Sequence, residues 1–352
     1  MRSVNLRTIA LWIVLLAAIP LAGLRWSIRP LPARADQATT ISLPLPGGEA
    51  GIGLDDLGFA PSIGKVLVPA GRTGLLDLID PDTKSIASIG GFSSSDAFAH
   101  GHGEGITSAD YGRGLLFVTD RTVKRLSVVD PNRRSIVASA PLATEPDYVR
   151  FVSDTSEVWV TEPSAQRIEI FRLPRAETPQ PVHAAFIAVP GGPESLVIDH
   201  LHARALTHLW TGTTIVIRLK EHSIEHRWSN GCRGSRGLAI DQQRGFLFAG
   251  CAEGKLEVLD LSAGKPLGSA ASGAGVDIIA YNEKLGHVYL PGADSATMAI
   301  IGVSAKGVVR VLTTVATARH AHCVIADDRA QIYVCDPSKG RILLFKDSLP
   351  PS

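Results

Sequence analysis

Ionisable residues recur along the chain where polar loops lead into apolar strands. Brought together, such groups would form a site for a cation or a polar small molecule, because carboxylates supply the oxygen ligands that calcium or magnesium favours. The sequence does not identify a cofactor, and the candidate is one divalent cation: calcium, magnesium or zinc. The predicted metal ligands among these residues are Glu104, Glu194 and Asp277. The complete set of predicted ligand-binding residues is Glu104, Asp147, Tyr148, Glu194, Arg236, Asp277 and His322.

Two His-x-His pairs offer a different type of metal ligand. His100 and His102 form the first pair, and His320 and His322 form the second. Imidazole nitrogens suit a softer transition metal than carboxylates do. Such a site would require that the two loops converge in the fold.

Seven short segments, each apolar at its start and small or polar at its end, indicate how these groups are positioned. Their starts lie 39 to 50 residues apart, about 44 on average, which is the span of one four-stranded propeller blade. A second alternating strand follows each segment after a polar turn, as at 125–130. The sequence therefore predicts an all-β, seven-bladed β-propeller of four-stranded blades. The segments start at Leu67, Phe117, Trp159, Leu209, Phe248, Tyr289 and Tyr333.

Three of these segments carry a family resemblance. FVTD at 117–120, WVTE at 159–162 and YVCD at 333–336, each followed by an aliphatic strand, resemble the YVTN repeat of bacterial surface and periplasmic propellers. The resemblance covers roughly residues 41–347 and implies the propeller fold. It implies little about function, because such propellers serve unrelated roles. Trp159 and Trp210 occupy the apolar strand position in this alignment, so we expect both in the core.

The two ends of the repeat region predict how the ring closes. The last repeat ends at 345–347 without an outermost strand, whereas 40–45 alternates like a strand before the first repeat. We expect this N-terminal strand to complete the last blade, which leaves no open sheet edge there. Inner strands of a propeller begin at its central channel, so the candidate residues would gather at one channel mouth. The alternative is that they line a hydrated channel without any ligand, or satisfy backbone amides of neighbouring loops.

Four cysteines predict two disulfides. Cys323 and Cys335 flank one predicted hairpin, and Cys232 and Cys251 flank the corresponding hairpin two blades earlier. Partners across a hairpin lie near the Cα separation of about 5.5–6 Å that a disulfide prefers. An even number of cysteines in an exported chain favours disulfides over metal thiolates. Two reduced buried pairs are the alternative.

The N-terminal segment, residues 1–35, has the pattern of a secretory signal. Arg2 and Arg7 precede an apolar run over 9–24, and Ala-Arg-Ala at 33–35 places small residues before a cleavage point. An uncleaved membrane anchor is the alternative, although this run is shorter than the ~20 residues that span a bilayer. Residues 36–352 are then one propeller domain, periplasmic or secreted. With an uncleaved segment, the domain would be anchored to the inner membrane and face the periplasm.

Charge restricts the partners of the mature domain. Loss of residues 1–35, which contain five arginines and no acidic residue, changes the formal net charge from +1 to −4. A mildly acidic domain lacks the basic surface of a nucleic-acid binder. A protein partner or a small molecule is expected instead, with membrane contact only through an uncleaved N-terminal segment.

No catalytic motif identifies a reaction, so three functions compete. The chain has no Gly-x-Ser-x-Gly, His-Glu-x-x-His or Cys-x-x-Cys-His. The first hypothesis is a binding module for a partner protein or a small ligand at the channel mouth. The second is a metal-dependent lactonase resembling the gluconolactonase-type propellers, whose typical asparagine ligands have no counterpart here. The third is the propeller subunit of a periplasmic amine dehydrogenase. In the second, a cation would polarise the substrate carbonyl or activate water near Glu104, Asp147, Glu194 and Asp277.

Overall fold

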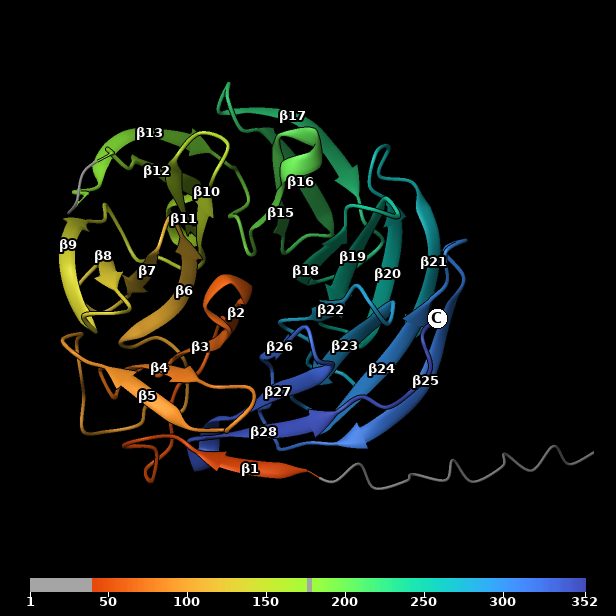
Figure 1. Ribbon diagram of the computed structural model, residues 1–352. Coiled ribbons are helices and arrows are strands. Elements are labelled where there is room, and N and C mark those ends of the chain that lie inside the picture. Colours follow the sequence, from red (N-terminus) through yellow and green to blue (C-terminus); the bar gives the residue numbers. More distant parts are fainter. Residues whose placement is uncertain (1–39, 176–178) are drawn as a thin grey trace, which may run out of the picture. The chain divides into compact units, whose positions relative to one another are not determined.

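The chain folds into a closed ring of β-sheets (Figure 1). The computed structural model describes residues 40–175 and 179–352. Within these ranges 28 strands form seven four-stranded antiparallel sheets, and there is no α-helix. The predicted all-β, seven-bladed propeller of four-stranded blades is confirmed. The predicted signal or anchor segment, 1–35, lies outside the described residues.

In six blades, four consecutive strands follow one another from the inner to the outer edge, and blade seven takes its outermost strand from the N-terminus. Blades one to three contain β2 (Gly58–Ala60), β3 (Lys65–Pro69), β4 (Leu76–Ile79) and β5 (Ile86–Ile89); β6 (Ile106–Gly112), β7 (Leu115–Asp120), β8 (Arg125–Asp130) and β9 (Ser135–Pro141); β10 (Val149–Val152), β11 (Glu157–Glu162), β12 (Arg167–Arg172) and β13 (Val182–Ala188). Blades four and five contain β14 (Val197–Asp199), β15 (Arg204–Leu209), β16 (Thr213–Arg218) and β17 (Ser223–Ser229); β18 (Ser235–Asp241), β19 (Phe246–Cys251), β20 (Lys255–Asp260) and β21 (Pro266–Ala271). Blades six and seven contain β22 (Ala280–Asn282), β23 (His287–Gly292), β24 (Thr297–Val303) and β25 (Val309–Ala316); β26 (Val324–Ala326), β27 (Gln331–Asp336), β28 (Arg341–Lys346) and β1 (Ile41–Pro44).

The acidic residue that ends some repeats holds neighbouring segments together. In blade three, Glu162 Oε2 lies 2.6 Å from Nε of Arg167 at the start of the next strand. In blade seven, Asp336 accepts a hydrogen bond from Arg341 Nε at 2.8 Å. Glu162 also accepts from the backbone N–H of Thr144 at 3.0 Å, in the loop that leads into the same blade. Both carboxylates are buried and charge-paired, so the repeat's last residue fixes the strand turn beside it.

The fourth repeat starts three residues earlier than the sequence alignment predicts. Leu206 of β15 pairs with Val197 of the inner strand, as the first residue of the other repeats pairs with its own inner strand. The repeat is therefore 206–209, and the predicted start at Leu209 is wrong. Trp210 lies in the turn after β15 and is 52% exposed, so its predicted core position is wrong, whereas Trp159 is fully buried. The apolar pair Leu209 and Trp210 resembles the start of a repeat in sequence, which explains the error.

The N-terminal strand closes the ring as predicted. β1 pairs antiparallel with β28, and Leu43 lies opposite Ile342. The backbone N–H of Leu45 continues this contact to the carbonyl of Gly340 at 3.0 Å. Gly340 has a φ of +51°, and a Cβ there would lie 2.0 Å from the carbonyl oxygen of Gly48. Only glycine therefore permits this close approach of the two chain ends.

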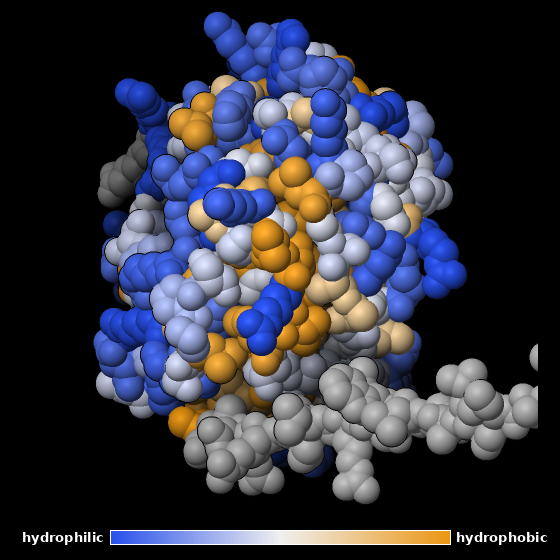
Figure 2. All heavy atoms as spheres, turned by 90° about the vertical axis from the view of Figure 1, so that its right-hand side faces the viewer, coloured by the Kyte–Doolittle hydropathy of each residue, from blue (hydrophilic) through white to orange (hydrophobic). Residues whose placement is uncertain are grey.

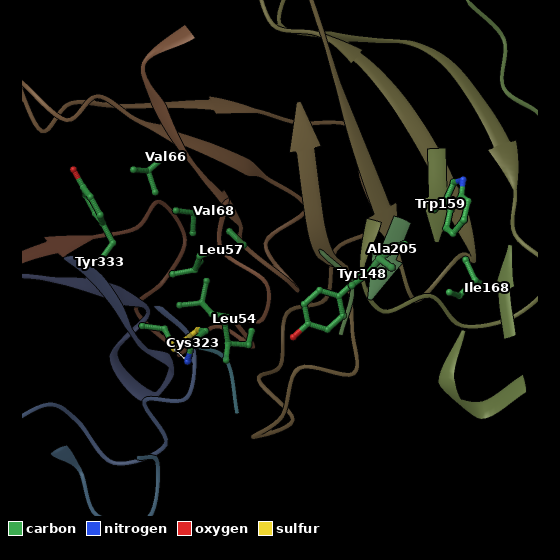
Figure 3. Close-up of a cluster of buried hydrophobic side chains, with 14 of the residues drawn as sticks. Leu54, Leu57, Val66, Val68, Tyr148, Trp159, Ile168, Ala205, Cys323 and Tyr333 are labelled. Atoms are coloured by element: carbon green, nitrogen blue, oxygen red, sulfur yellow. Dashed lines mark hydrogen bonds between the residues drawn. A yellow bond between two sulfur atoms is a disulfide. The ribbon is translucent and has the colours of Figure 1, made fainter. Parts of the chain in front are cut away.

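The largest apolar cluster extends across several blades rather than lying within a single blade. It joins buried side chains of blades one, three, four and seven with those of β1. Figure 3 shows Val66 and Leu57 of blade one, Trp159 of blade three and Tyr333 of blade seven in this cluster. Because this cluster crosses blade boundaries, packing of one blade depends on its neighbours, and we expect the ring to unfold cooperatively.

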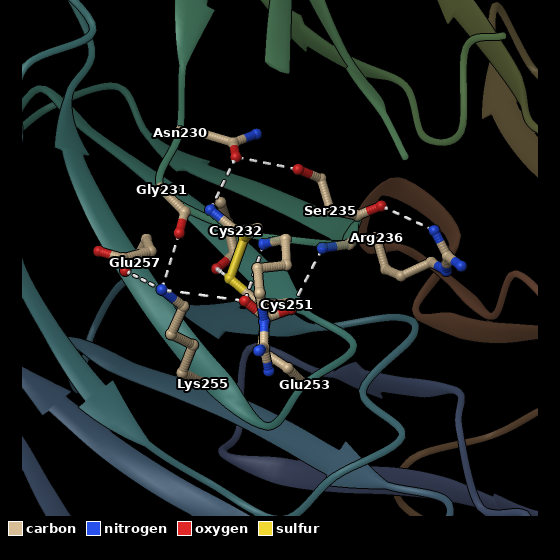
Figure 4. The surroundings of a disulfide bond; sticks show 12 residues. Asn230, Gly231, Cys232, Ser235, Arg236, Cys251, Glu253, Lys255 and Glu257 are labelled. Atoms are coloured by element: carbon tan, nitrogen blue, oxygen red, sulfur yellow. Dashed lines mark hydrogen bonds and ion pairs between the residues drawn. A yellow bond between two sulfur atoms is a disulfide. The ribbon is translucent and has the colours of Figure 1, made fainter. Parts of the chain in front are cut away.

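Both predicted disulfides are present. Cys232–Cys251 and Cys323–Cys335 have Cα separations of 5.2 and 5.5 Å. Figure 4 shows the first of them beside the start of β18, where it joins the loop before that strand to the end of β19. Disulfides of this kind persist in oxidising compartments, which agrees with a location outside the cytoplasm.

Removal of the Cys323–Cys335 bridge should destabilise the protein measurably. We expect the double variant Cys323→Ala/Cys335→Ala to lose about 3 kcal/mol of unfolding free energy, because the bridge restricts a loop of 12 residues in the unfolded chain. Urea unfolding followed by circular dichroism measures this loss. An unchanged midpoint in the double variant, with wild type kept oxidised, would contradict the expectation.

The outer surface carries scattered apolar residues. Figure 2 shows a band of apolar side chains on the side of the ring where β21 and β25 lie. Leu267, Val308 and Val311 are the large exposed hydrophobic residues in and next to these strands. In the described ranges, no helix has the length and apolar character needed to cross a membrane.

Candidate functional site

Seven ionisable side chains, one from the segment that leads into or begins each inner strand, gather at one mouth of the channel. They line two adjoining pockets of about 770 and 520 Å³, which share His102, Arg236 and Asp277. Each blade thus contributes one group to a common space. In blade order, the seven residues are Asp55, His102, Asp147, Glu194, Arg236, Asp277 and His322.

The structure brings most of the predicted ligand-binding residues to this mouth. Asp147, Glu194, Arg236, Asp277 and His322 each line one or both pockets. Each of them lies three residues before the inner-strand residue that pairs with the first residue of its repeat. That shared register is the reason why alignment of the repeats was sufficient to find them.

Asp55 was missed although it occupies the same register. Gly58 of β2 pairs with Leu67, the first residue of its repeat, so Asp55 stands three residues before the paired position. Asp147 stands in the same relation to Arg150, which pairs with Trp159. The alignment could therefore have located Asp55 from its distance to Gly58 alone.

Blade two departs from the common register, which explains why Glu104 was predicted in place of His102. The pairing of β6 with β7 shifts between Ile106 and Ser108, and Thr107 occupies the expected place but is fully buried. The group that reaches the mouth is His102, farther back in the loop before β6. Among the described residues that line the two pockets, Glu104 does not occur.

Arg121 lies between two of the mouth carboxylates and was also missed. Its Nη2 lies 2.6 Å from Asp147 Oδ1 and 3.4 Å from Asp55 Oδ2. Its remaining donors bind the backbone carbonyls of His102 at 2.7 Å and Pro146 at 2.9 Å. Arg121 follows the last residue of its repeat, outside the inner strands, so the repeat alignment gave no reason to consider it.

Asp55 and His102 form a partly buried ion pair. His102 Nδ1 lies 2.8 Å from Asp55 Oδ2, and Asp55 is 5% exposed. Burial opposes ionisation of Asp55, but the charges of His102 and Arg121 outweigh it and hold its pKa below the usual range. The negative charge of Asp55 and its hydrogen bond raise the pKa of His102 to about 9. This contact fixes the direction of the His102 ring.

At the other three carboxyl groups, burial outweighs the nearby positive charges and favours the neutral form. Burial raises the pKa of Asp147 well above the ordinary value, and the charge of Asp55 adds to this effect. Burial and the charge of Asp277 raise the pKa of Glu194 to about 8. Burial also raises the pKa of Asp277. Ionisation of such buried carboxyl groups lowers the stability of the ligand-free protein, and groups of this kind are typical of binding or catalytic sites.

Trp210, Glu194 and Arg236 form one wall of the larger pocket. The indole Nε1 of Trp210 donates a hydrogen bond to Glu194 Oε2. The Arg236 guanidinium stacks 4.7 Å above the Trp210 ring and lies 3.8 Å from Glu194 Oε1. Figure 4 shows Arg236 extending away from the adjacent disulfide. A half-exposed indole beside a cation and a carboxylate can contact both the apolar and the polar parts of a small ligand.

Tyr148 lies deeper than the other predicted residues. It is 7% exposed and lines both the larger mouth pocket and a further pocket of about 280 Å³ among the inner strands. Arg150 stacks 5.2 Å from the Tyr148 ring and pairs with Asp56 at 2.6 Å. Burial raises the pKa of the Tyr148 phenol well above its ordinary value. Tyr148 therefore forms a neutral wall of the channel below the mouth.

One His-x-His residue from each pair reaches the candidate metal-binding position. One ligand atom each of His102, Asp277 and His322 lies within 4.8 Å of the other two. His100 and His320 also line the smaller pocket, but they are not part of this group. The predicted carboxylate trio of Glu104, Glu194 and Asp277 is not among the candidate metal-binding groups in the described ranges.

Comparison with known proteins identifies the fold but no family. No protein-family model and no curated protein matches this chain. A chain in the crystal structure of the mitotic checkpoint complex is similar over 92% of this chain and 98% of its own, with a TM-score of 0.71 and 9% identity. Hydrazine synthase of Kuenenia stuttgartiensis matches over 90% and 99%, with a TM-score of 0.68 and 11% identity. The Cps50 (Swd1) β-propeller domain of Myceliophteria thermophila matches over 85% and 98%, with a TM-score of 0.67 and 11% identity.

Proposed function

We propose that the protein is an exported binding module of the YVTN-repeat type that captures a small polar ligand at the channel mouth. The observation that carries this proposal is the convergence of seven ionisable side chains, one per blade, on two adjoining pockets. A structural role would pair these charges fully, yet burial leaves several of the carboxylates with raised pKa values. The pockets and the exposed Trp210 beside them supply the concave, mixed surface that small ligands need.

Export is supported by two independent features. The described part of the chain contains two disulfides, and residues 1–35 have the composition of a signal or anchor segment. On this proposal, residues 36–352 act as a single propeller domain in the periplasm or outside the cell. A partner protein is the alternative ligand, since one similar propeller comes from the structure of a complex.

Thermal-shift measurements with a small-molecule panel test the proposal. The panel contains neutral sugars, carboxylates, amines and lactones, each added to the mature protein. A ligand at 100 times its Kd should stabilise the fold by about 2.7 kcal/mol. We expect this stabilisation to disappear in Arg236→Ala and Trp210→Ala. Turnover of a lactone in the same panel would instead assign hydrolysis to the mouth.

Glu225 provides the matched control for removal of a carboxylate from the mouth. It lies in β17 on an outer strand, paired with Arg218 at 2.8 Å, away from both pockets. Glu225→Gln should leave ligand stabilisation unchanged, whereas Glu194→Gln should reduce it. Equal stabilisation of wild type and both mouth variants, Arg236→Ala and Trp210→Ala, would overturn the proposal.

A further inference from the structure

We propose that His102, Asp277 and His322 bind one divalent transition-metal ion of the zinc class at the channel mouth. The three side chains precede the inner strands of blades two, six and seven. Two imidazoles with one carboxylate form a ligand set that suits zinc and neighbouring transition metals rather than calcium or magnesium. This inference goes beyond the capture of a small ligand, and either proposal can fail without the other.

The three ligand side chains would have to move only slightly to coordinate one ion. One ligand atom of each residue lies within 4.8 Å of the others, and the two histidine rings have centroids 5.2 Å apart at 37°. Ligand atoms around a tetrahedral zinc ion are separated by about 3.4 Å, given Zn–N distances of about 2.0–2.1 Å. His102 is 40% exposed on its side chain and has room to turn. A shift of about 1 Å would therefore complete the site.

Both histidines are held in the orientation that metal-ligating histidines adopt. His102 Nδ1 lies 2.8 Å from the Asp55 carboxylate, and His322 Nδ1 lies 2.7 Å from the backbone carbonyl of His320. A carboxylate and a carbonyl accept hydrogen bonds, so each imidazole keeps its proton on Nδ1 toward them when a metal binds. Nε2 of each ring is then the ligand atom, and metal binding would displace the proton that His102 holds there in the metal-free protein. An acceptor behind each ligating imidazole is the usual outer-shell arrangement.

An unsatisfied buried atom points to the same place. Nε2 of His322 is buried and has no hydrogen-bond partner, which costs free energy unless a ligand or water compensates it. The carboxylate of Asp277 lines the same pocket as the two imidazoles and would offset part of the charge of a divalent cation.

Three protein ligands leave one tetrahedral position open. The smaller pocket, about 520 Å³, is lined by His102, Asp277 and His322 themselves, so this position would face it. Zinc sites with three protein ligands keep water or a ligand in the fourth position, unlike closed structural sites. The ion would therefore be exchangeable, and a chelator should remove it without unfolding the protein.

Calorimetric titration of the chelator-treated full-length protein with zinc chloride tests this site. We expect one zinc ion per chain in wild type and no binding of this class in His322→Ala or Asp277→Asn. Asp55→Asn should weaken binding by about 10- to 100-fold, as loss of an outer-shell partner typically does. Substitution with cobalt(II) should give visible absorption bands of a tetrahedral nitrogen–oxygen site in wild type and none in His322→Ala or Asp277→Asn.

His320→Ala is the matched control, because its side chain lines the same pocket while only its backbone carbonyl contacts His322. It should bind zinc as wild type does. Melting curves recorded in chelator verify that each variant folds, and His102→Ala replaces His322→Ala if the latter does not. Absence of zinc binding in wild type would overturn the proposal. So would unchanged affinity in a folded variant without His322 or His102.

Discussion

A chain that begins at Gly47, and so lacks β1, should lose the cooperative folding of the ring. β1 supplies the outermost strand of blade seven and buries Leu43, with Leu45 directly after it. Two fully buried leucines alone contribute about 3–6 kcal/mol, and the loss also exposes the edge of β28 to other chains. Thermal unfolding by circular dichroism, with size-exclusion chromatography, should show an early, broad transition and association of chains.

Two point variants in the full-length chain distinguish the loss of ring closure from the effect of a shorter chain. Leu43 is buried against blade seven, whereas Ile41 in the same strand is 45% exposed. Leu43→Asp should destabilise the protein strongly, and Ile41→Asp should have a small effect. A shortened chain that melts at the wild-type temperature would show that β1 is dispensable for ring closure.

Loss of the Arg121 cation should have the second largest effect. Its guanidinium lies between Asp147 and Asp55, all three side chains being 14% exposed or less. Removing one partner of a buried charge network leaves uncompensated charge and costs about 3–5 kcal/mol. We expect Arg121→Leu to show this loss in urea unfolding at neutral pH. Its stability should recover as the pH falls, because protonation of Asp147 removes the repulsion.

A second substitution should restore much of this stability. Arg121→Leu/Asp147→Asn removes the cation together with the carboxylate that it contacts most closely. Arg218→Leu is the control, because its pair with Glu225 lies on the surface, where ion pairs contribute about 0–1 kcal/mol. Equal stability of Arg121→Leu and wild type at neutral pH would contradict a compensating role for this cation.

The fold was predictable because its signals are local and repeated. Seven apolar segments at blade spacing indicated the ring, 40–45 indicated the closing strand, and the cysteine positions indicated two hairpin disulfides. Each signal depends on period-two alternation or on short sequence separation. The fourth repeat was misplaced because Leu209 and Trp210 imitate an apolar strand start, and only the pairing of Leu206 with Val197 reveals the register.

The site was predictable only where it follows the repeat. Six of its seven positions share a register with the inner strands, and alignment found five of these six. Asp55 shares this register but was overlooked, and the register shift in β6 moved the contribution of blade two from the aligned place to His102. Arg121 and Trp210 come from turns after the second strand of a blade, where alternation says nothing about side-chain direction. Such positions depend on loop conformation and charge pairing, which a single sequence does not encode locally.

The stability of the Glu194→Gln variant in the presence of chelator tests most directly whether the mouth is built for a ligand. The folded-state pKa of Glu194 is raised to about 8 from 4.5, chiefly by burial. The folded protein therefore retains a proton that the unfolded chain releases, and Glu194 destabilises the fold increasingly as the pH rises from 4.5 to 8. Gln retains an acceptor for Trp210 without the charge. We expect the variant to be more stable than wild type at pH 8 and above, yet defective in ligand binding. A variant less stable than wild type there would show that Glu194 is a structural group and that the mouth charges serve the fold.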